Sequence, residues 1–341
     1  MTENRRFKLI RRPHGIPVAE DFRLDRDPTP ALEDGQFLIH NHYASLDPAI
    51  RGWMADEPSY LPPIPLGEPV RATTVGEIVE SRSAAFPVGK FVVGLNAIED
   101  YSVGRSDGYT SLIDPSVAPS LTHFLSAMGA VGLTGYFGLL EIGRPKPGDT
   151  VLVTGAAGAV GSMVGQIAKI KGCRAVGIAG GAAKCQRVTR DYGYDAAIDY
   201  RGKTADQIST EIAAACPKGV DVIFENVGGV CLDAGLMNIN VGARVALCGL
   251  ISEYNSTGPR HGTRNLWQLI VKSATIRGFL VPEFRDRFAE GAAAIAGWIR
   301  EGRLRVDEHV ETGIENAHPA FVRLFHGTNE GKMLLKLGSG G

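Results

Sequence analysis

The chain has 341 residues, which corresponds to about two domains at roughly 150 residues each. Hydrophobic residues make up 44% and charged residues 21%, so each half has enough apolar side chains for an ordinary core. A formal net charge of −1, without a basic patch interleaved with aromatic residues, argues against a nucleic-acid-binding protein.

The first part of the chain, residues 1–125, is predicted to form a barrel-like domain of short strands. Turn residues separate short apolar runs there, which is typical of such domains. The basic residues at the start precede a first strand (FKLI), and no long apolar run follows that would make a secretory signal. Residues 58–69 contain five prolines, and we expect an extended loop there because proline neither continues a helix nor donates to a strand ladder. The other predicted strands are FLIHNHYA, ATTVGEIVE, KFVVGL and GYTSLI.

The second part, residues 126–299, is predicted to form a parallel sheet covered by helices on both faces. Residues 121–143 have the length and small-residue content of a helix, and strands and helices alternate after them. Continuous apolar strands between amphipathic helices are typical of a doubly wound nucleotide-binding fold. The predicted strands are 150–155, 174–180, 196–200, 220–228, 243–249 and 274–279, and the helices between them are 159–172, 182–193, 205–216, 230–239 and 266–273.

A further helix is predicted over 284–302, and the last run, LLKL, is predicted to be a strand. We expect the C-terminal segment, about 300–341, to return to the first domain.

The cysteines and the longest apolar runs bear on the environment of the protein. All five cysteines lie in the second half, at spacings of 12, 31, 15 and 17 residues, without a CxxC pair. Because a structural zinc site needs closely spaced thiolates, we expect reduced, mostly buried thiols instead. No apolar stretch approaches the roughly 20 residues needed to cross a bilayer. A cytoplasmic location without membrane contact is the resulting expectation.

The strongest motif lies where the first strand of the parallel sheet turns into a helix, in the segment VLVTGAAGAVGSMVGQIAK. Gly155, Gly158 and Gly161 stand three residues apart there. Such a turn brings backbone amides and a helix N-terminus up to a pyrophosphate, and the last glycine lets the helix pack closely on the strand. A tight turn in another kind of α/β domain is the alternative. The buried strand before the turn and the helix after it favour a dinucleotide.

The second strand indicates which dinucleotide is bound. NAD sites usually carry an acid about 20 residues after the glycines, whereas this strand ends at Gly180 and Gly181. Lys184 follows on the first helical turn, and its ammonium would neutralise a 2′-phosphate. Tyr200, at the end of the third strand, would add a hydroxyl. Lys184 alone could equally be a solvated surface charge, but together with the missing acid it favours NADP(H).

Several segments resemble the medium-chain dehydrogenase/reductase superfamily, in its zinc-free branch of prostaglandin reductases and alkenal double-bond reductases. The similar segments run in the family's order over nearly the whole chain: HYASLDPAIRGWM, residues 131–181, FENVGG, CGLISEYN, NLWQLIVKSATIRGF and GTNEGKMLLKL. The resemblance implies a GroES-like β-barrel N-terminal domain, a Rossmann domain and a homodimer.

The resemblance also implies roles for particular residues. Tyr254, in the ISEYN turn, would lie near the nicotinamide ribose and the substrate oxygen, although it could instead be a packed aromatic residue. Asn329 matches a residue that contacts the nicotinamide amide. Tyr43 and Arg51 are candidates for either the pocket or the fold. The expected cofactor-binding residues, from the glycine turn and from the family, are Thr134, Gly155, Ala157, Gly158, Ala159, Val160, Gly161, Gly180, Gly181, Lys184, Tyr200, Asn226, Gly228, Gly249, Tyr254 and Asn329.

The sequence predicts hydride transfer without a metal. Zinc-dependent relatives carry a glycine-histidine-glutamate motif where this chain has Gly67, Glu68 and Pro69, and one carboxylate cannot hold zinc. Hydride addition to a bare carbonyl would then lack a Lewis acid, whereas addition to the β-carbon of an enone delocalises the charge into an enolate that one or two hydroxyls can support. The relatives usually have a second aromatic residue where this chain has Ala49, so the shape of the substrate pocket stays open.

We therefore expect an NADPH-dependent oxidoreductase that reduces the C=C bond of α,β-unsaturated aldehydes or ketones. Two alternatives remain at this point: a zinc-free quinone reductase, and a non-catalytic NADPH-binding relative.

Overall fold

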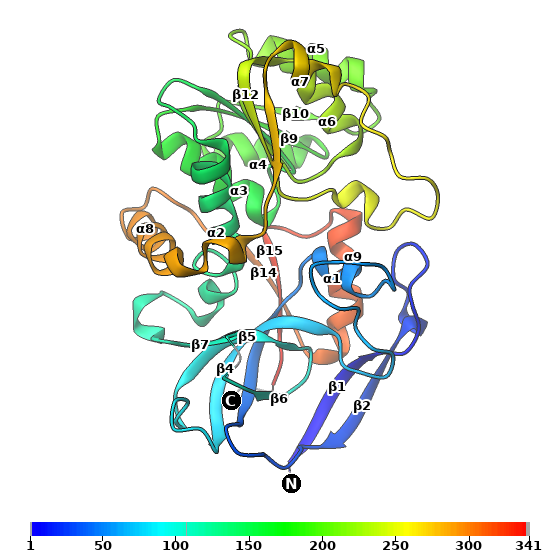
Figure 1. Ribbon diagram of the computed structural model, residues 1–341, viewed down its shortest axis with the longest axis vertical. Helices are drawn as coiled ribbons and strands as arrows, with labels where there is room; N and C mark the ends of the chain where they lie inside the picture. The colour runs from blue at the N-terminus through cyan, green and yellow to red at the C-terminus, as the bar shows by residue number, and fades with distance from the viewer. Residues whose placement is uncertain (1, 107, 339–341) are drawn as a thin grey trace. The chain divides into compact units, whose positions relative to one another are not determined.

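The computed structural model describes residues 2–106 and 108–338 (Figure 1). The chain divides into two compact units. Unit 1 runs from the N-terminus to Ser126 and resumes at Glu308, and unit 2 comprises Ala127–Asp307. The sequence analysis set the C-terminal return near residue 300. The segment up to Asp307 stays with unit 2, where the Arg187 guanidinium and the Tyr192 hydroxyl both bond the Asp307 carboxylate.

Unit 1 is built on a mixed sheet whose neighbouring strands follow the order β14-β15-β3-β4-β5-β7, with β6 paired to β3. The strands β1 and β2 form a separate antiparallel ladder. The chain returns to this sheet at its end, because β15 pairs antiparallel with β3 and parallel with β14. The elements are β1 (Glu3–Leu9), β2 (Phe22–Pro28), β3 (Phe37–Ser45), α1 (Ala49–Trp53), β4 (Arg71–Ser81), β5 (Phe91–Ala97), β6 (Tyr101–Gly104), β7 (Thr110–Ile113), β14 (Glu308–Thr312), α9 (Ala317–His326) and β15 (Lys332–Lys336).

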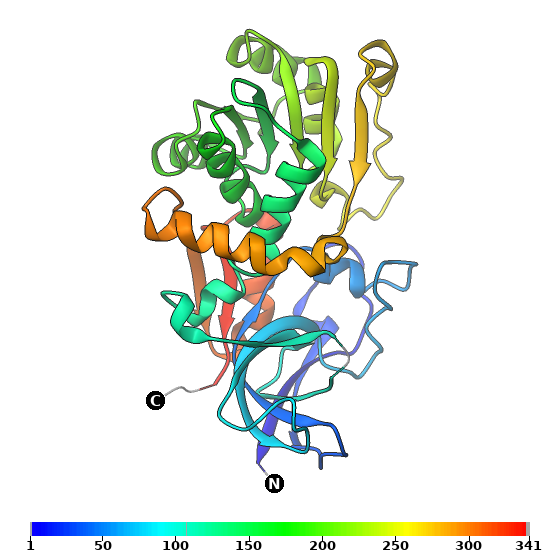
Figure 2. The same ribbon diagram turned by 60° about the vertical axis from the view of Figure 1, so that its left-hand side comes forward.

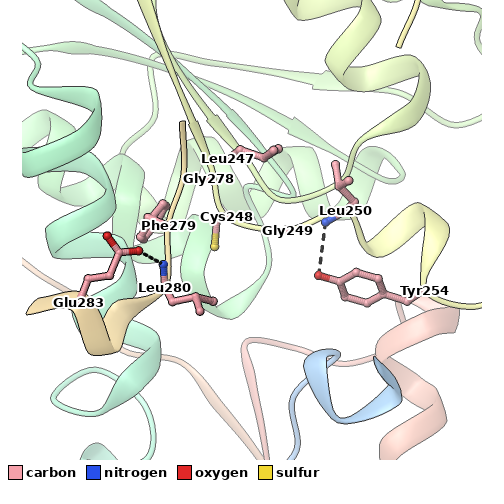
Figure 3. Close-up of a pocket in the computed structure, with 9 residues that line it drawn as sticks. All are labelled: Leu247, Cys248, Gly249, Leu250, Tyr254, Gly278, Phe279, Leu280 and Glu283. Carbon is pink, nitrogen blue, oxygen red and sulfur yellow. Dashed lines mark hydrogen bonds between the residues drawn. The ribbon is translucent and has the colours of Figure 1, made fainter. Parts of the chain in front are cut away.

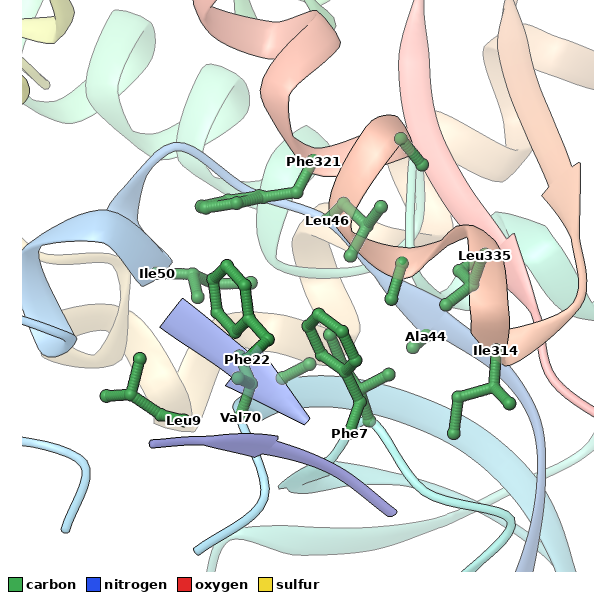
Figure 4. Packing of buried hydrophobic residues seen from close by; sticks show 14 of the residues in the cluster. Phe7, Leu9, Phe22, Ala44, Leu46, Ile50, Val70, Ile314, Phe321 and Leu335 are labelled. Carbon is green, nitrogen blue, oxygen red and sulfur yellow. The ribbon is translucent and has the colours of Figure 1, made fainter. Parts of the chain in front are cut away.

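The hydrophobic core of unit 1 joins its N-terminal and C-terminal parts (Figure 4). Phe7 and Phe22 stack with ring centroids 4.7 Å apart. Phe321 of α9 and Leu335 of β15 pack in the same cluster. Since these residues are almost fully buried, the C-terminal segment contributes to the stability of unit 1 in the same way as the first strands do.

In the described part of unit 2, six parallel strands follow the order β10-β9-β8-β11-β12-β13 (Figure 2). Helices α3 and α4 pack against β8, β9 and β10, and α5 packs against α6. The predicted doubly wound α/β fold is thereby confirmed. The elements are α2 (Ala130–Phe137), β8 (Thr150–Thr154), α3 (Ala159–Ile170), β9 (Arg174–Ala179), α4 (Ala182–Tyr192), β10 (Ala196–Asp199), α5 (Ala205–Ala215), β11 (Val220–Glu225), α6 (Gly229–Leu236), β12 (Ile239–Leu247), α7 (Trp267–Val271), β13 (Thr275–Gly278) and α8 (Phe288–Arg300).

One predicted element is wrong: residues 121–143 are not a single helix. A 3₁₀ turn spans Leu121–Phe124, α2 begins only at Ala130, and a π-helical turn covers Gly138–Gly143. The chain folds back sharply before α2, so that a Cβ atom at Gly132 would lie 1.7 Å from the carbonyl oxygen of Ala127. Gly132 and Gly135 lie inside α2, so only the middle of the predicted helix is α-helical.

Three further boundaries differ from the prediction. The predicted strand 243–249 begins earlier, with β12 at Ile239, and the predicted strand 220–228 ends with β11 at Glu225. The predicted helix 284–302 starts as a 3₁₀ segment, Val281–Arg287, and becomes α-helical only at Phe288.

Among the described residues, no helix combines the length and the apolar character required to cross a membrane.

Candidate dinucleotide-binding site

The glycine turn between β8 and α3 is too tight for a side chain at its last glycine. Gly155 has φ 63°, in the left-handed region that favours glycine. A Cβ atom at Gly161 would lie 2.3 Å from the carbonyl oxygen of Gly155, closer than real atoms approach. The amide of Gly158 donates to the same oxygen, 2.9 Å away. The N-terminal amides of α3 therefore open onto a tight turn of glycines and small apolar residues, which is a suitable anion site.

The turn lies where the strand order of the sheet reverses. The chain proceeds from β8 to β9 and β10 on one side, and from β11 to β12 and β13 on the other. In open α/β sheets, ligands bind in the crevice at the carboxyl ends of the two strands that flank this reversal. The flanking strands here are β8 and β11, and the crevice between their ends is where a dinucleotide fits the fold.

A buried hydrogen-bond network joins the ends of β8 and β11. Glu225 accepts three bonds at Oε1, from the Thr154 hydroxyl at 2.6 Å and from the amides of Val227 and Gly228 at 2.7 Å each. The side-chain amide of Asn226 donates to the Thr154 carbonyl at 2.7 Å. Complete burial raises the pKa of Glu225, while the bonds it accepts oppose that shift. This network fixes the floor of the crevice.

The sequence analysis named Asn226 and Gly228 as cofactor-lining residues. It missed Glu225 and Thr154, whose pairing depends on two strands that are far apart in the sequence.

A cationic corner lies beyond the ends of β9 and β10, and we use this name for Gly180, Gly181, Lys184, Tyr200 and Arg201. A Cβ atom at Gly180 would lie 3.2 Å from Nε of Arg201 and 3.3 Å from the Tyr200 hydroxyl. Burial lowers the pKa of Lys184, and the neighbouring positive charge of Arg201 lowers it further. In the parts of the chain that the structure describes, neither Lys184 nor Arg201 has a carboxylate within ion-pair distance of its side chain. The corner therefore has an excess of positive charge, which suits a phosphate.

One carboxylate does lie at the cationic corner. Asp199, the last residue of β10, accepts hydrogen bonds at Oδ1 from the amides of Gly181 at 2.7 Å and Arg201 at 3.0 Å. These bonds lower the pKa of Asp199. Its carboxylate thus holds the backbone of the corner in place. The sequence analysis also missed Arg201, although its position directly after Tyr200 at the end of a strand was a usable signal.

Tyr254 and the carboxyl ends of β12 and β13 enclose a pocket of about 400 Å³ (Figure 3). The Tyr254 ring points back toward the backbone of Gly249 and Leu250, and its hydroxyl accepts a bond from the Leu250 amide at 3.3 Å. The hydroxyl proton is therefore left to donate to another group. Burial raises the pKa of Tyr254, so the hydroxyl stays protonated above the usual tyrosine range. The pocket is lined by Leu247, Cys248, Gly249, Leu250, Tyr254, Gly278, Phe279, Leu280 and Glu283.

Cys248 contributes its sulfur to the wall of this pocket (Figure 3). Burial, together with the nearby Glu225 carboxyl, raises the pKa of the Cys248 thiol to about 12. The thiol is thus protonated at neutral pH and a poor nucleophile.

Two further predicted cofactor-binding residues, Thr134 and Asn329, lie in different units. Thr134 is half-buried in α2, between fully buried neighbours, and α2 packs on α3 through Gly135. Asn329 belongs to unit 1, where its side-chain amide donates to the Gly331 carbonyl at 2.9 Å. The glycine turn, the cationic corner, Thr134, Asn226, Gly228, Gly249 and Tyr254 all belong to unit 2.

Arg51 and Glu68 have structural partners within unit 1. The Arg51 guanidinium is buried and donates to the carbonyls of Pro13 and Gly15, which assigns it to the fold. Glu68 is largely exposed and lies 3.6 Å from the Arg6 guanidinium. Residues 2–106 and 108–338 contain no group of three or more His, Cys, Asp or Glu side chains arranged to hold a metal ion. Over the same residues, all five cysteines are free.

Comparison with known proteins identifies the family. Residues 5–112 match the family model of an N-terminal domain of oxidoreductases, and residues 159–297 match the model named zinc-binding dehydrogenase. The NADPH-dependent curcumin reductase of Escherichia coli is 40% identical, over 98% of this chain and 97% of that protein. The chain belongs to the medium-chain dehydrogenase/reductase family.

Two further comparisons define its branch within that family. Prostaglandin reductase 1 of Bos taurus is 36% identical, over 94% of this chain and 95% of that protein. The crystal structure of CurA from Vibrio vulnificus in complex with NADPH superposes with a TM-score of 0.91 at 40% identity, over 98% of this chain and 100% of that chain. The predicted family is thus confirmed, in its branch of NADP-dependent alkenal and enone reductases.

Proposed function

We propose that the protein uses NADPH to reduce the C=C bond of α,β-unsaturated aldehydes and ketones. The observation that carries this proposal is the arrangement of unit 2: a glycine turn whose backbone suits an anion, a cationic corner with more cations than carboxylates, and a pocket into which one tyrosine hydroxyl can donate. The names of its relatives support the same chemistry, because they include an NADPH-dependent curcumin reductase and prostaglandin reductases.

The cofactor would be held at two anionic groups. The amides of Ala159, Val160 and Gly161, at the start of α3, would bind the pyrophosphate. The cationic corner would bind the 2′-phosphate, with Lys184 and Arg201 supplying charge and Tyr200 a hydroxyl. When bound, NADPH supplies the hydride. The remaining contacts to the cofactor are assigned to Thr134, Asn226, Gly228 and Gly249. Asn329 of unit 1 is assigned to the nicotinamide amide.

Tyr254 would support the negative charge that develops on the substrate. Hydride addition to the β-carbon of an enone places this charge on the carbonyl oxygen as an enolate. The Tyr254 hydroxyl accepts a hydrogen bond from the Leu250 amide. Its own proton is therefore available for a hydrogen bond to the substrate's carbonyl oxygen. Because the charge is delocalised, a hydroxyl can stabilise it without a Lewis acid. We therefore propose a reaction without a metal.

The test is NADPH consumption against a matched panel of enals, enones and quinones, with and without a chelator. We expect enals and enones to be reduced with the best kcat/KM, unchanged by the chelator, and the product to be saturated at the former double bond. Faster turnover of quinones would favour the quinone reductase. Tight NADPH binding without oxidation by any compound of the panel would favour a non-catalytic binding protein, and a chelator-sensitive rate would overturn the metal-free mechanism.

We further propose that the protein is a homodimer in the cytoplasm. β13 is the last strand of the described sheet in unit 2, so the backbone groups on its outer side are free to pair. Next to it, Trp267 and Ile270 of α7 are 66% and 70% exposed, and Val241 is 77% exposed. An apolar patch beside a free strand edge suits a second copy of the same surface. The five unpaired cysteines support a reducing compartment.

A further inference from the structure

Tyr194 is a buried residue that connects the loop after α4 to the helix of the glycine turn. It is only 4% exposed and lies between α4 and β10. Its hydroxyl donates to the carbonyl oxygen of Gly161 at 2.6 Å. Gly161 is the last glycine of the turn and lies in the first turn of α3. A side chain 33 positions further along the chain thus contacts the backbone of the anion site.

The neighbouring backbone is shaped to admit the tyrosine ring. A Cβ atom at Gly165 would lie 1.8 Å from Cζ of Tyr194, so any other residue at this position of α3 would collide with the ring. On the side of β9, a Cβ atom at Gly177 would lie 3.2 Å from Cδ1 of the same ring. The ring therefore fills a space that two glycines on two different elements leave open, and its position has little freedom.

The Tyr194 hydroxyl interacts with two residues of α3 that are hydrogen-bonding partners in a regular helix. In an α-helix, the carbonyl of residue 161 is the acceptor for the amide of residue 165. The Tyr194 hydroxyl donates to the Gly161 carbonyl, and the Gly165 amide interacts with the hydroxyl oxygen. A side-chain hydroxyl that bonds into this ladder bends the helix locally and so determines the geometry of its first turn. The turn that is fixed in this way carries the amides that face the anion.

We propose that Tyr194 is a positioning residue for the dinucleotide pyrophosphate. It does not touch the cofactor: it sets the position of the first turn of α3 relative to the sheet, and thereby the direction of the amides from Ala159 to Gly161. This inference rests on the proposed role of the glycine turn. The alternative is that Tyr194 merely fills the core, in which case its hydroxyl affects stability and not cofactor affinity.

The chain offers a matched control two residues away. Tyr192 is also buried, at 3% exposure, and its hydroxyl bonds the Asp307 carboxylate at 3.0 Å. Tyr192→Phe and Tyr194→Phe therefore each remove one buried, hydrogen-bonded hydroxyl. Of these two hydroxyls, only that of Tyr194 bonds to α3.

The experiment measures Kd for NADPH and for NADH, and kcat at saturating NADPH, in Tyr194→Phe, Tyr192→Phe and the unmodified protein. We expect Tyr194→Phe to raise both Kd values by the same factor, about threefold to tenfold, with kcat unchanged, because both nucleotides share the pyrophosphate. Tyr192→Phe should lower Tm and leave both Kd values unchanged.

Hydrogen exchange gives a second measurement, in which Tyr194→Phe should speed exchange in the first turn of α3 and Tyr192→Phe should not. Unchanged Kd values in Tyr194→Phe, an effect on NADPH alone, or equal effects of the two variants would each overturn the inference. If Gly161→Ala also left NADPH binding intact, the proposed anion turn itself would be wrong, which separates the two failures.

Discussion

The glycine turn and the cationic corner both suit anions, but they are made of different parts of the chain. At the turn, the donors are backbone amides, and a side chain is excluded at Gly161 because a Cβ atom there would lie 2.3 Å from a carbonyl oxygen. At the corner, the donors are the side chains of Lys184, Tyr200 and Arg201. The comparison teaches that the turn can recognise only what all dinucleotides share, whereas the corner can distinguish one dinucleotide from another.

The two regions also differ in how they affect the free energy of the protein before a ligand binds. The amides of the turn require no ordering of side chains when a ligand binds. The corner holds like charges together in a partly buried place, which lowers the pKa of Lys184. A phosphate would relieve this repulsion. Selectivity for the 2′-phosphate is therefore expected to come from charges that are unfavourable without it.

The largest effect is expected at the turn. Gly161→Ala should weaken the binding of NADPH and NADH alike, by about a hundredfold or more, because the added methyl group forces the Gly155 backbone to move. Calorimetry with both nucleotides measures this. Gly297→Ala in α8, where nothing lies within 4 Å of the new atom, is the control and should leave both affinities unchanged. Selective loss of NADPH binding in Gly161→Ala would contradict the division of roles.

At the corner, Lys184→Ala should weaken NADPH binding about tenfold to a hundredfold and leave NADH binding nearly unchanged. The reason is the loss of one charge-assisted bond to the 2′-phosphate. Lys203→Ala is the matched control, since Lys203 lies two residues from Arg201 but is paired with Glu211 at 2.6 Å. Equal losses for both nucleotides in Lys184→Ala would remove this lysine from phosphate recognition.

A substitution at Tyr254 tests whether the rate of the reaction can be lowered without a change in cofactor affinity. Tyr254→Phe should lower kcat about tenfold across several enones, because the enolate loses one hydroxyl donor, while Kd for NADPH stays the same. Since burial raises the pKa of Tyr254, the protonated donor persists above the usual tyrosine range, and kcat of the unmodified protein should not fall through loss of this proton between neutral and mildly alkaline pH. Steady-state kinetics over that range measure both effects. Unchanged turnover in the variant would exclude Tyr254 from the mechanism.

The smallest effect on cofactor binding is expected at the apolar patch beside β13. Ile270→Asp should convert the dimer into monomers, as measured by analytical ultracentrifugation, while the Kd for NADPH changes by less than about twofold, because the patch is separate from the glycine turn and the cationic corner. Val88→Asp replaces a side chain that is 60% exposed in unit 1 and is the control. A protein that is monomeric without any substitution would refute the dimer.

Much of unit 2 was predictable because its signals are local. The alternation of apolar strands with amphipathic helices gave the parallel sheet, and the spacing of Gly155, Gly158 and Gly161 after a buried strand indicated the turn. Lys184 and Tyr200 were predictable as well, because their positions follow from counting strands and helices. Whether these residues bind the nucleotide in the proposed roles is what the variants above test.

Other features were not predictable from local patterns. Residues 121–143 looked helical by composition, but the chain folds back on Ala127 before α2 begins. Arg201 belongs to the cationic corner only because β10 lies beside β9, which brings its guanidinium close to Gly180. Tyr194 looked like an ordinary residue of a connecting loop, although its hydroxyl contacts Gly161.

The sequence by itself determined the family, the order of most strands and helices, and a tight glycine turn that suits an anion. Those properties depend on residues close together in the chain, where steric restrictions and hydrophobic periodicity act directly. Only the tertiary structure decided which distant side chains contact that turn and which form the cationic corner. Glu225 with Thr154, and Tyr194 with Gly161, are brought together by the packing of neighbouring strands and helices, and no local pattern encodes that packing.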